Sequence, residues 1–543
     1  MIAAWSPRRI SGSCALFTFF VAFDVTFRYV NITHLFAELP VSVDIDVLIV
    51  GAGAAGLTLA IDLARRGVSF QLIEQNTQPF SGSRGKGIQP RTMEIFEDLG
   101  FVDRVAAAGG PYPPLCQYRP DGTHKMSLLT EADVFPTAAE PYAAPLMLPQ
   151  FSTEAVMRER LAELGHHPHF GTQLVGFQQD NDGVTARIEQ QGGEQVVRAR
   201  FLVGTDGGRS FVRHALAIDF PGEALGVRAI VADVRLEGLD RSAWHRFQFG
   251  APETQVMICP LAGTDLFQIQ APVALDGEVD LSPAGLTTLV EDRTGRGDIT
   301  VRSVSWSSIY TMSARLADRY RIGRVFIAGD AAHVHPPTGG QGLNTSVQDA
   351  YNLGWKLASV LAGAPEALLD SYEAERRPIA ANMLRLSTRL LGEAKQGTMR
   401  RDREARQLDL GYRGSSLSVP GSVSGKVQAG DRAPDAPCRG QAGQRTRLFT
   451  VFQGTHWTLL GYEVRDRSSA IAGVRIVAVG AGHELVDDDG HIAEAYGIEP
   501  DHWVLVRPDG YIAGIFSSDE LETGLSRYFA HVLPPCQTYA ASS

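Results

Sequence analysis

The sequence predicts an α/β fold, and three observations support that prediction. Residues 43–50 (VDIDVLIV) form an apolar run rich in β-branched side chains, and a glycine-rich turn joins this run to a helical pattern that ends at Gly67. Residues 226–310 instead alternate apolar and polar side chains, as expected of antiparallel strands. The chain has 543 residues, too many for one ordinary core, so we expect several domains.

Composition narrows the class of protein. With 44% hydrophobic and 20% charged residues, the chain is expected to be globular rather than disordered or polytopic in a membrane. A net charge of -11 argues against nucleic acid as a partner. The five cysteines are far apart and form no CxxC pair, so neither a disulfide framework nor a metal site is expected, and a reducing cytoplasm fits best.

The first 43 residues differ from the rest of the chain. Arg8 and Arg9 precede the apolar run 14–23, which is too short to span a bilayer, for which about 20 residues are needed. We therefore expect no stable membrane insertion. Two interpretations remain: an N-terminal extension or misplaced start, which we prefer, and an export signal, which lacks a recognisable small-x-small cleavage site.

The glycine-rich turn has the spacing GxGxxG. Gly51 permits the turn, Gly53 lets a pyrophosphate approach the backbone, and Gly56, which follows Ala55, lets the helix pack on the strand. At the end of the next strand pattern, Glu74 is placed to accept hydrogen bonds from ribose hydroxyls. This Rossmann-like unit predicts a dinucleotide whose adenosine ribose carries no phosphate, FAD or NAD, rather than NADP.

Two further apolar runs end in glycine and aspartate. They are residues 201–210 (FLVGTDGGRS) and residues 324–333 (RVFIAGDAAH). The second is followed by the loop 334–344 (VHPPTGGQGLN) and then by a helical pattern over residues 346–361. In this order and at these separations, the three motifs resemble those of the class A flavoprotein aromatic hydroxylases, the FAD monooxygenases typified by p-hydroxybenzoate hydroxylase and phenol hydroxylase. The resemblance extends from about Asp44 and includes residues 83–96 and 150–154.

This resemblance implies a domain plan. Residues 44–395 would form a Rossmann-like FAD-binding domain interleaved with a mostly antiparallel-sheet substrate domain, whose sheet spans about 220–315. Residues 396–428 are expected to be a linker. Residues 429–543 would form a thioredoxin-like C-terminal domain with a structural or oligomer-forming role, and a homodimer is one expectation.

The resemblance also implies a cofactor site. Asp330 would hold the FAD ribityl chain, although a helix-capping role is an alternative, and Leu343 and Asn344 would contact the isoalloxazine edge through their backbone. A glycine-rich loop that opens a helix suits this task because it directs N–H groups and the positive end of the helix dipole at one place. The remaining expected contacts with the cofactors are Arg84 and Gln150 near the ADP and pyrophosphate, Asp206 and Arg209 near FAD and NAD(P)H, and Gly329 and Gly342 in the motifs themselves.

By the same resemblance, NAD(P)H reduces FAD, O2 forms a C4a-hydroperoxyflavin, and this electrophile hydroxylates a phenolic or polycyclic aromatic substrate. NADH and NADPH are not distinguished. Pro337 would place its carbonyl near the reacting carbon. Lys86 occupies the position of an aspartate in phenol hydroxylase, which leaves His333 and His335 as candidate bases or as structural residues.

By the same resemblance, one face of the antiparallel sheet would cover a flat substrate with aromatic side chains. The candidates are Phe247, Phe249, Trp306 and Tyr310, although for each of them a place in the core is the more common role. Two other functions remain open on this scaffold. One is Baeyer-Villiger or epoxidising oxygenation, and the other is a non-catalytic FAD-binding redox module. A flavin-dependent halogenase is disfavoured because no tryptophan lies in a GxWxWxIP segment.

Overall fold

The computed structural model describes residues 41–119, 121–128, 134–248, 253–396, 401–421, 423, 425–465 and 471–533. The expected N-terminal extension, residues 1–43, lies almost entirely outside this part, and so does Phe249. Within the described ranges, no helix combines the length and apolar character needed to cross a bilayer.

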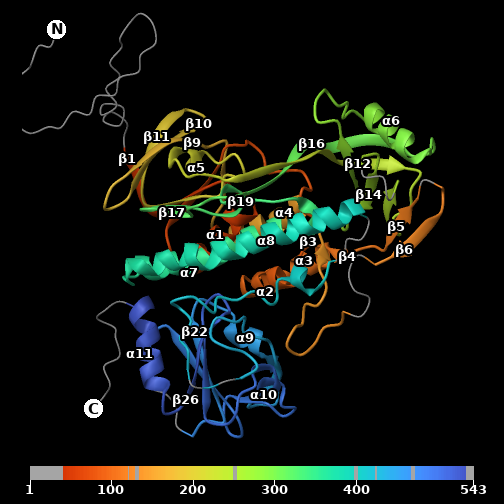
Figure 1. Cartoon of the computed structure of the whole chain (residues 1–543). Helices are drawn as coiled ribbons and strands as arrows, with labels where there is room; N and C mark the ends of the chain where they lie inside the picture. Colours follow the sequence, from red (N-terminus) through yellow and green to blue (C-terminus); the bar gives the residue numbers. More distant parts are fainter. Residues whose placement is uncertain are drawn as a thin grey trace, which may run out of the picture. The chain divides into compact units, whose positions relative to one another are not determined.

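An eight-stranded sheet of the described residues carries the GxGxxG turn (Figure 1). The first strand begins at Val41, two residues before the predicted start, and pairs in parallel with the second strand and with the strand before the DG motif. The strands are β1 (Val41–Val50), β2 (Phe70–Glu74), β8 (His169–Phe170), β9 (Gln173–Gln179), β10 (Val184–Gln190), β11 (Gly193–Gly204), β17 (Arg321–Ile322) and β18 (Val325–Ile327). Because β1, β11 and β18 are parallel neighbours, the three glycine-containing motifs emerge at one edge of the sheet.

Helices cover this sheet. The first helix lies against the long helix after the GD motif, where Gly354 permits close approach, since a Cβ there would collide with the Asp62 carboxylate. The predicted helix 346–361 begins four residues earlier, at Gly342. The helices are α1 (Ala54–Arg65), α4 (Gln150–Glu163), α5 (Phe211–Ala215), η2 (Gly329–Ala331), η3 (Pro337–Gly339), α7 (Gly342–Leu361), η4 (Glu366–Leu369) and α8 (Asp370–Gln396).

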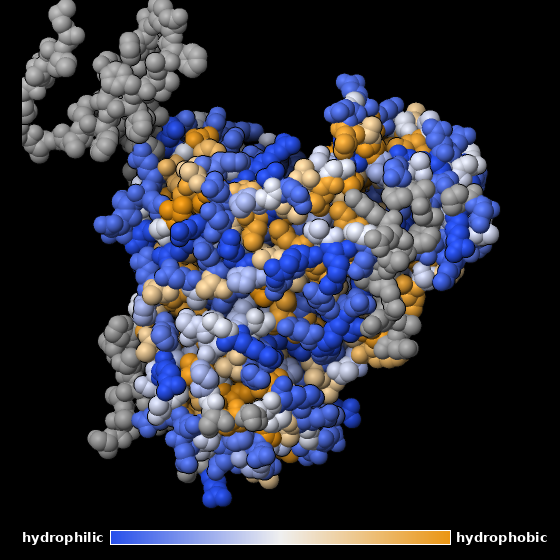
Figure 2. Space-filling view, in the orientation of Figure 1, coloured by the Kyte–Doolittle hydropathy of each residue, from blue (hydrophilic) through white to orange (hydrophobic). Residues whose placement is uncertain are grey.

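A second eight-stranded sheet of described residues is mostly antiparallel. Its strands, in spatial order, are β19 (His333–Val334), β16 (Thr300–Leu316), β12 (Gly222–Glu237), β15 (Phe267–Val273), β14 (Val256–Pro260), β13 (Trp244–Phe247), β5 (Leu115–Tyr118) and β6 (His124–Ser127). The expected strand pattern is confirmed, and the chain passes between the two sheets several times. Figure 2 shows apolar side chains gathered over the region of β16.

The two faces of this second sheet differ. Ile230, Ile258, Phe267 and Phe247 share an apolar core with helix α6 (Pro283–Thr294). The prediction that Phe247 covers a ligand is therefore wrong: its ring stacks on Tyr118 on the face that α6 buries. Strand alternation caused the error, because periodicity identifies two faces but not which one a helix will cover.

Trp306 and Tyr310 lie on the opposite face. The register places Cys259, Gln268, Asp233 and Trp306 in one row across β14, β15, β12 and β16. Directly opposed residues of antiparallel strands point to the same side of a sheet, so these four form one strip of the face that lies away from α6.

A third, small sheet and two helices follow β2. They are β3 (Gly87–Ile88), α2 (Pro90–Asp98), α3 (Val102–Ala108), β4 (Gly110–Pro111) and β7 (Leu146–Met147). The loop before β3 crosses from the nucleotide-binding sheet to the second sheet, where a Cβ on Gly82 would collide with the Trp306 ring.

The expected linker 396–428 is packed rather than exposed over much of its described length. It contains η5 (Arg403–Arg406), and Leu408, Tyr412, Leu417 and Val419 are buried. The linker prediction was wrong for these residues, because charges and small residues hid apolar side chains at irregular spacing that no periodic pattern marks.

The C-terminal sheet has the order β21-β20-β24-β23-β22-β25-β26. Its elements are β20 (Pro437–Gly440), β21 (Arg445–Arg447), α9 (Leu448–Phe452), β22 (Trp457–Tyr462), β23 (Val474–Val479), β24 (Leu485–Val486), α10 (His491–Tyr496), β25 (His502–Val506), β26 (Ile512–Ser517) and α11 (Leu521–Val532). Strands β22 and β23 are parallel, whereas β25 is antiparallel to β22 and to β26.

Candidate flavin site

The three glycines of the first turn have three different surroundings. Gly51 has φ +104°, and a Cβ there would lie 2.5 Å from Thr205 O. A Cβ on Gly56 would collide with the carbonyl of Gly51. Gly53 is open, since the nearest atom to its Cβ position is Glu154 Oε1 at 3.9 Å. The first and third glycines therefore serve the protein's own packing, whereas the second leaves a cradle that a phosphate group can fill.

Glu74 lies beside this cradle at the end of β2. Its Oε2 accepts a hydrogen bond from Ala52 N at 3.0 Å, and its Oε1 accepts one from Asn76 N at 3.0 Å. These bonds fix the carboxylate next to the glycine-rich turn, which is the position that the sequence predicted for a ribose contact.

The DG motif follows β11. The Thr205 hydroxyl donates to Val50 O or Gly51 O, which binds this motif to the first turn. Asp206 Oδ2 accepts from Val212 N at 3.1 Å, while its Oδ1 is buried without a partner. Burial raises the pKa of Asp206. Arg209 is exposed. An orphaned acceptor at this edge fits a hydroxyl or N–H donor of a bound cofactor.

The GD motif presents a free carboxylate. Gly329 has φ +63°, and its N–H donates to Asp349 Oδ2 at 3.2 Å. Asp330 is exposed between the buried Gly329 and Ala331 and lies inside η2, whose N-cap residue is Ala328. The geometry thus offers no support for the capping alternative, and it leaves the Asp330 side chain able to meet a ligand.

The glycine-rich loop before α7 is held by Asn344. Its Oδ1 accepts from Gln89 N at 2.8 Å, and its Nδ2 donates to Gly87 O and Gly340 O, each at 2.9 Å. Because this side chain is committed to the loop, any contact of Asn344 with a flavin falls to its backbone, in line with the sequence expectation. Gly340 has φ +64°, which lets the loop turn into the helix.

Three separate segments meet near Gly85. Gly85 N donates to Gln150 Oε1 at 3.1 Å, and Gln150 N donates to Gly85 O at 2.8 Å. Leu343 lies 3.5 Å from the Cβ position of Gly85. The neighbouring Arg84 is exposed, and its guanidinium lies 5.9 Å from the Trp306 ring centroid. The structure therefore brings the segments that carry Arg84, Gln150 and Leu343 together at Gly85.

His333 is part of a buried ion network. Its Nε2 lies 2.7 Å from Asp349 Oδ2, and the other oxygen of Asp349 accepts from Arg376 Nε at 2.8 Å. The imidazole is 1% exposed. This geometry disfavours the expected catalytic role of His333, because the ring nitrogen that faces Asp349 is committed to that carboxylate. Sequence patterns could not reveal the partner, which lies on α7.

His335 is half-buried. Its Nδ1 lies 3.0 Å from Pro336 O, and burial lowers its pKa. Its Nε2 has no partner and lies 3.7 Å from the Cβ position of Gly342. Pro337 itself is exposed at the start of η3.

Glu154 was not singled out from the sequence. Its carboxyl accepts from Gln150 Nε2 at 2.8 Å, and burial raises its pKa to about 7. The nearby Glu74 raises the pKa further. The only sequence signal was the spacing of Gln150 and Glu154, which places both on one side of α4.

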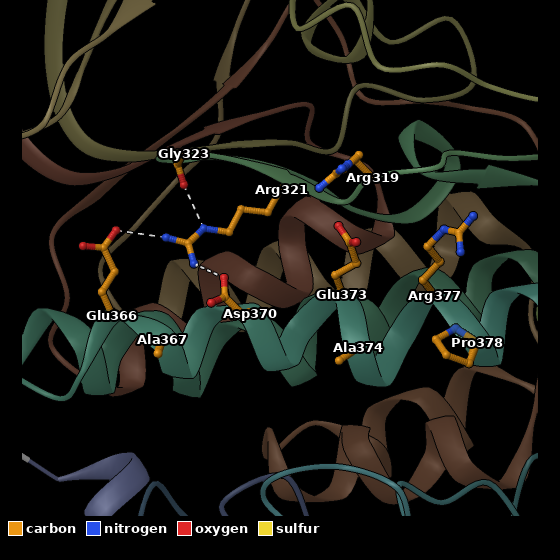
Figure 3. Close-up of a pocket in the computed structure, with 10 residues that line it drawn as sticks. All are labelled: Arg319, Arg321, Gly323, Glu366, Ala367, Asp370, Glu373, Ala374, Arg377 and Pro378. Carbon is orange, nitrogen blue, oxygen red and sulfur yellow. Dashed lines mark hydrogen bonds and ion pairs between the residues drawn. The ribbon is translucent and has the colours of Figure 1, made fainter.

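A polar cleft of about 740 Å³ lies away from these motifs, between β17 and the start of α8 (Figure 3). Arg321 points across it to Glu366 and Asp370. Since its charges are largely paired with one another and none of the three motifs lines it, we do not assign this cleft to the cofactor.

Comparison with known families agrees with the motifs. The family model "FAD binding domain" matches residues 44–387, and "Aromatic-ring hydroxylase, C-terminal" matches residues 426–535. A flavin-dependent monooxygenase of Mycobacteroides abscessus is 41% identical over 472 residues, which cover 86% of this chain and 96% of that protein. The 12-dehydrotetracycline 5-monooxygenase/anhydrotetracycline 6-monooxygenase of Streptomyces rimosus is 34% identical, with 89% and 97% covered.

Solved structures show the same likeness. The flavin-dependent monooxygenase PieE, in complex with FAD and substrate, has a TM-score of 0.78 at 25% identity, covering 91% of this chain and all of that one. Aklavinone-11 hydroxylase, in a ternary complex with FAD and aklavinone, has a TM-score of 0.76 at 28% identity, with 89% and 98% covered. The expected α/β fold and FAD as cofactor are thereby confirmed. On its motifs, its fold and these matches, the chain belongs to the FAD-dependent aromatic-ring hydroxylases and is a flavoprotein monooxygenase.

Proposed function

We propose that this protein hydroxylates a phenolic or polycyclic aromatic compound with NAD(P)H as electron donor. The observation that carries the proposal is the loop before β3. At Gly85 the loop is hydrogen-bonded to Gln150 beside the flavin motifs, and at Gly82 it packs on Trp306 of the second sheet. A planar ring held against that sheet face would lie next to the flavin region.

The related proteins support the substrate class. By their names, relatives act on rifampicin, on tetracycline intermediates and on aklavinone, all of which are large oxygenated ring systems. The face that would receive the ring carries Trp306, Gln268 and Asp233, a mixture of aromatic and polar groups suited to an oxygenated polycycle.

The flavin, when bound, supplies transfer of one oxygen atom of O2 to the substrate after its reduction by NAD(P)H. The chain's own task is positioning. Gly53 and Glu74 would hold the pyrophosphate and ribose, Asp330 the ribityl chain, and Asp206 and Arg209 would meet NAD(P)H. Pro337 would border the substrate ring and exclude water, because its fixed backbone keeps the loop in one conformation.

We further propose a thioredoxin-like C-terminal domain. In its sheet, β22 and β23 are parallel, β25 pairs antiparallel with β22, and β26 follows β25 at the edge. That strand order and those directions support the assignment.

Substrate-dependent turnover tests the function. Purified protein with FAD should oxidise NAD(P)H faster when a suitable phenol, naphthol or hydroxyanthraquinone is added, and mass spectrometry should find one added oxygen atom at a carbon–hydrogen position. A ring-expanded lactone as product would favour Baeyer-Villiger oxygenation, and an epoxide would favour epoxidation. Flavin binding with no acceleration by any compound of this panel would favour the non-catalytic redox module.

Pro337→Ala tests the assignment of the loop. The variant should retain FAD and still oxidise NAD(P)H with substrate, but release more hydrogen peroxide, because a ring misplaced by about 1 Å loses about 100-fold in oxygen transfer. Product and peroxide are measured per NAD(P)H consumed. Unchanged coupling with weaker substrate affinity would place Pro337 outside the oxygen-transfer region.

A further inference from the structure

Lys86 is a buried lysine without a carboxylate partner among the described residues. Its Nζ donates to Gln268 Oε1 on β15 and lies 4.4 Å from the centroid of the Trp244 ring on β13. Both contacts are on the second sheet, whereas Lys86 belongs to the loop that passes the flavin motifs. The amine thus lies on the face of the second sheet that carries Trp306.

Gln268 holds this amine as part of a buried chain of hydrogen bonds. Its Nε2 donates to the backbone and side-chain oxygens of Ser83, and the Ser83 hydroxyl donates to Asp233 Oδ1. Asp233 Oδ2 is buried without a partner. The amide of Gln268 therefore has a fixed orientation, with its oxygen towards Lys86.

The surroundings of Lys86 lower the pKa of its amine. Burial lowers the pKa of Lys86, and the positive charge of Arg401 lowers it further, while Cys259 and Asp233 act in the opposite direction. Burial raises the pKa of Cys259 to about 11, so this thiol is protonated near neutral pH. Burial likewise raises the pKa of Tyr112, to about 12.

The same surroundings connect Lys86 to the glycine-rich loop. Arg401, whose positive charge lowers the pKa of Lys86, donates from Nη2 to Thr338 O at 2.8 Å. Thr338 directly follows Pro337. Arg401 thus links the surroundings of Lys86 to the loop that would border the reacting carbon.

From this geometry we propose that Lys86 is the base that accepts the hydroxyl proton of a phenolic substrate, with Gln268 as its positioning residue. The inference rests on the proposed function for the nature of the substrate. In the step, the phenol O–H bond breaks, its electron pair stays on oxygen, and the proton forms a new N–H bond with the amine lone pair. The products are a phenolate, which activates the ring for electrophilic attack, and an ammonium ion that stabilises it.

The test uses 2-hydroxyanthraquinone and the FAD-loaded protein without NAD(P)H. The anion of this dye absorbs at longer wavelength than its neutral form, and the titration is run below the dye's own pKa. Absorbance reports the ionisation of the bound dye, and a weakly buffered pH indicator reports protons released on binding. Wild-type protein should bind the anion and release no proton, because the proton moves to Lys86.

Three variants give two kinds of expected result. Lys86→Met should bind the neutral dye without proton release. Lys86→Arg should bind the anion but release about one proton per dye, because a guanidinium has no free lone pair at this pH. Gln268→Glu should behave like Lys86→Arg, since a carboxylate keeps the lysine charged. Lys125→Met, which removes an exposed lysine of β6, is the control and should match the wild type.

Equal FAD content in all variants shows that each has folded. The proposal is overturned if wild-type protein fails to bind the dye, binds it in the neutral form, or releases a proton on binding it. It is also overturned if Lys86→Met still binds the anion. No turnover is involved in these measurements, so they test Lys86 separately from the proposed function. A base at Lys86 in a protein that hydroxylates no aromatic compound would contradict the proposed function but not the role of Lys86.

Discussion

At the scale of single residues, the glycines of the GxGxxG turn have two different roles, one in folding and one in cofactor binding. Gly51 and Gly56 face the protein's own backbone, whereas Gly53 faces open space. A side chain at Gly51 or Gly56 would strain the fold, while one at Gly53 would occupy only the cradle. The same spacing therefore contains two packing positions and one binding position.

We predict that Gly53→Val folds, because the atom nearest to its Cβ position is 3.9 Å away. The variant should retain little FAD, because the new side chain occupies the cradle of the pyrophosphate. Gly56→Val should instead lower the free energy of unfolding by about 1–3 kcal/mol or more, as overpacking does. Flavin absorbance per chain and urea unfolding distinguish the two. Gly392→Ala, where nothing lies within 4 Å, is the control. Full flavin retention by Gly53→Val would refute the role given to the cradle.

Glu154 gives a prediction of pH dependence. Its pKa is raised to about 7 by burial, so its contribution to stability is complete below its ordinary pKa and is lost as the pH rises towards 7. Glu154→Gln keeps the oxygen that accepts from Gln150 but carries no charge.

The variant should therefore unfold at higher urea concentration than the wild type at about pH 8, with a difference of up to about 3 kcal/mol, and match it more closely at about pH 5. Urea unfolding at both pH values checks this. A difference that is the same at the two values would contradict the raised pKa.

At the scale of elements, a buried charge network joins β19, α7 and α8. Asp349 on α7 binds His333 of β19 through one oxygen and Arg376 of α8 through the other. Gly329 N also donates to Asp349, so the network fixes the strand-to-helix connection that presents Asp330. A histidine after the GD motif is thus explained by packing.

Asp349→Asn should destabilise the protein by about 3–5 kcal/mol, because it leaves the charge of Arg376 buried with reduced compensation. His333→Asn should lose about 1–3 kcal/mol and some FAD, but leave the pH profile of product formation unchanged. Asp370→Asn, whose side chain is 74% exposed, is the control. A shifted pH profile in His333→Asn would restore its role as a base.

At the scale of the whole molecule, the C-terminal sheet is anchored in the helices of the flavin-binding part. The turn between β25 and β26 is buried there: Arg507 pairs with Glu375 of α8 at 2.7 Å, and Asp509 accepts from Trp355 Nε1 of α7 at 3.0 Å. Arg91 of α2 donates to the Asp509 carbonyl at 2.8 Å. The described residues from Val41 onward accordingly form one unit.

Arg507→Ala should destabilise the whole protein by about 3–5 kcal/mol and loosen FAD, because Glu375 stays buried while losing this partner. Arg439→Ala breaks an exposed pair with Asp488 and should change stability by about 0.5 kcal/mol or less. Thermal unfolding and flavin release are measured together. If Arg507→Ala unfolds only the C-terminal sheet and keeps FAD, the two parts are independent.

Local patterns determined much of this protein. The glycine spacing, the first strands, the helix after the GD motif and the alternating strands of the second sheet could be predicted, because each depends on residues close in the chain. Patterns failed for the packed segment 401–421, for the side that Phe247 faces and for the partner of His333.

Those failures share one physical reason. Burial and charge pairing depend on which distant segment covers a side chain, and periodicity carries no information on that choice. The sequence by itself determined a nucleotide-binding α/β fold and the order and spacing of its three motifs. Only the tertiary structure decided that His333 is committed to Asp349, that Gly53 alone among the three glycines of the GxGxxG turn faces open space, and that Lys86 meets Gln268 on the sheet face that carries Trp306.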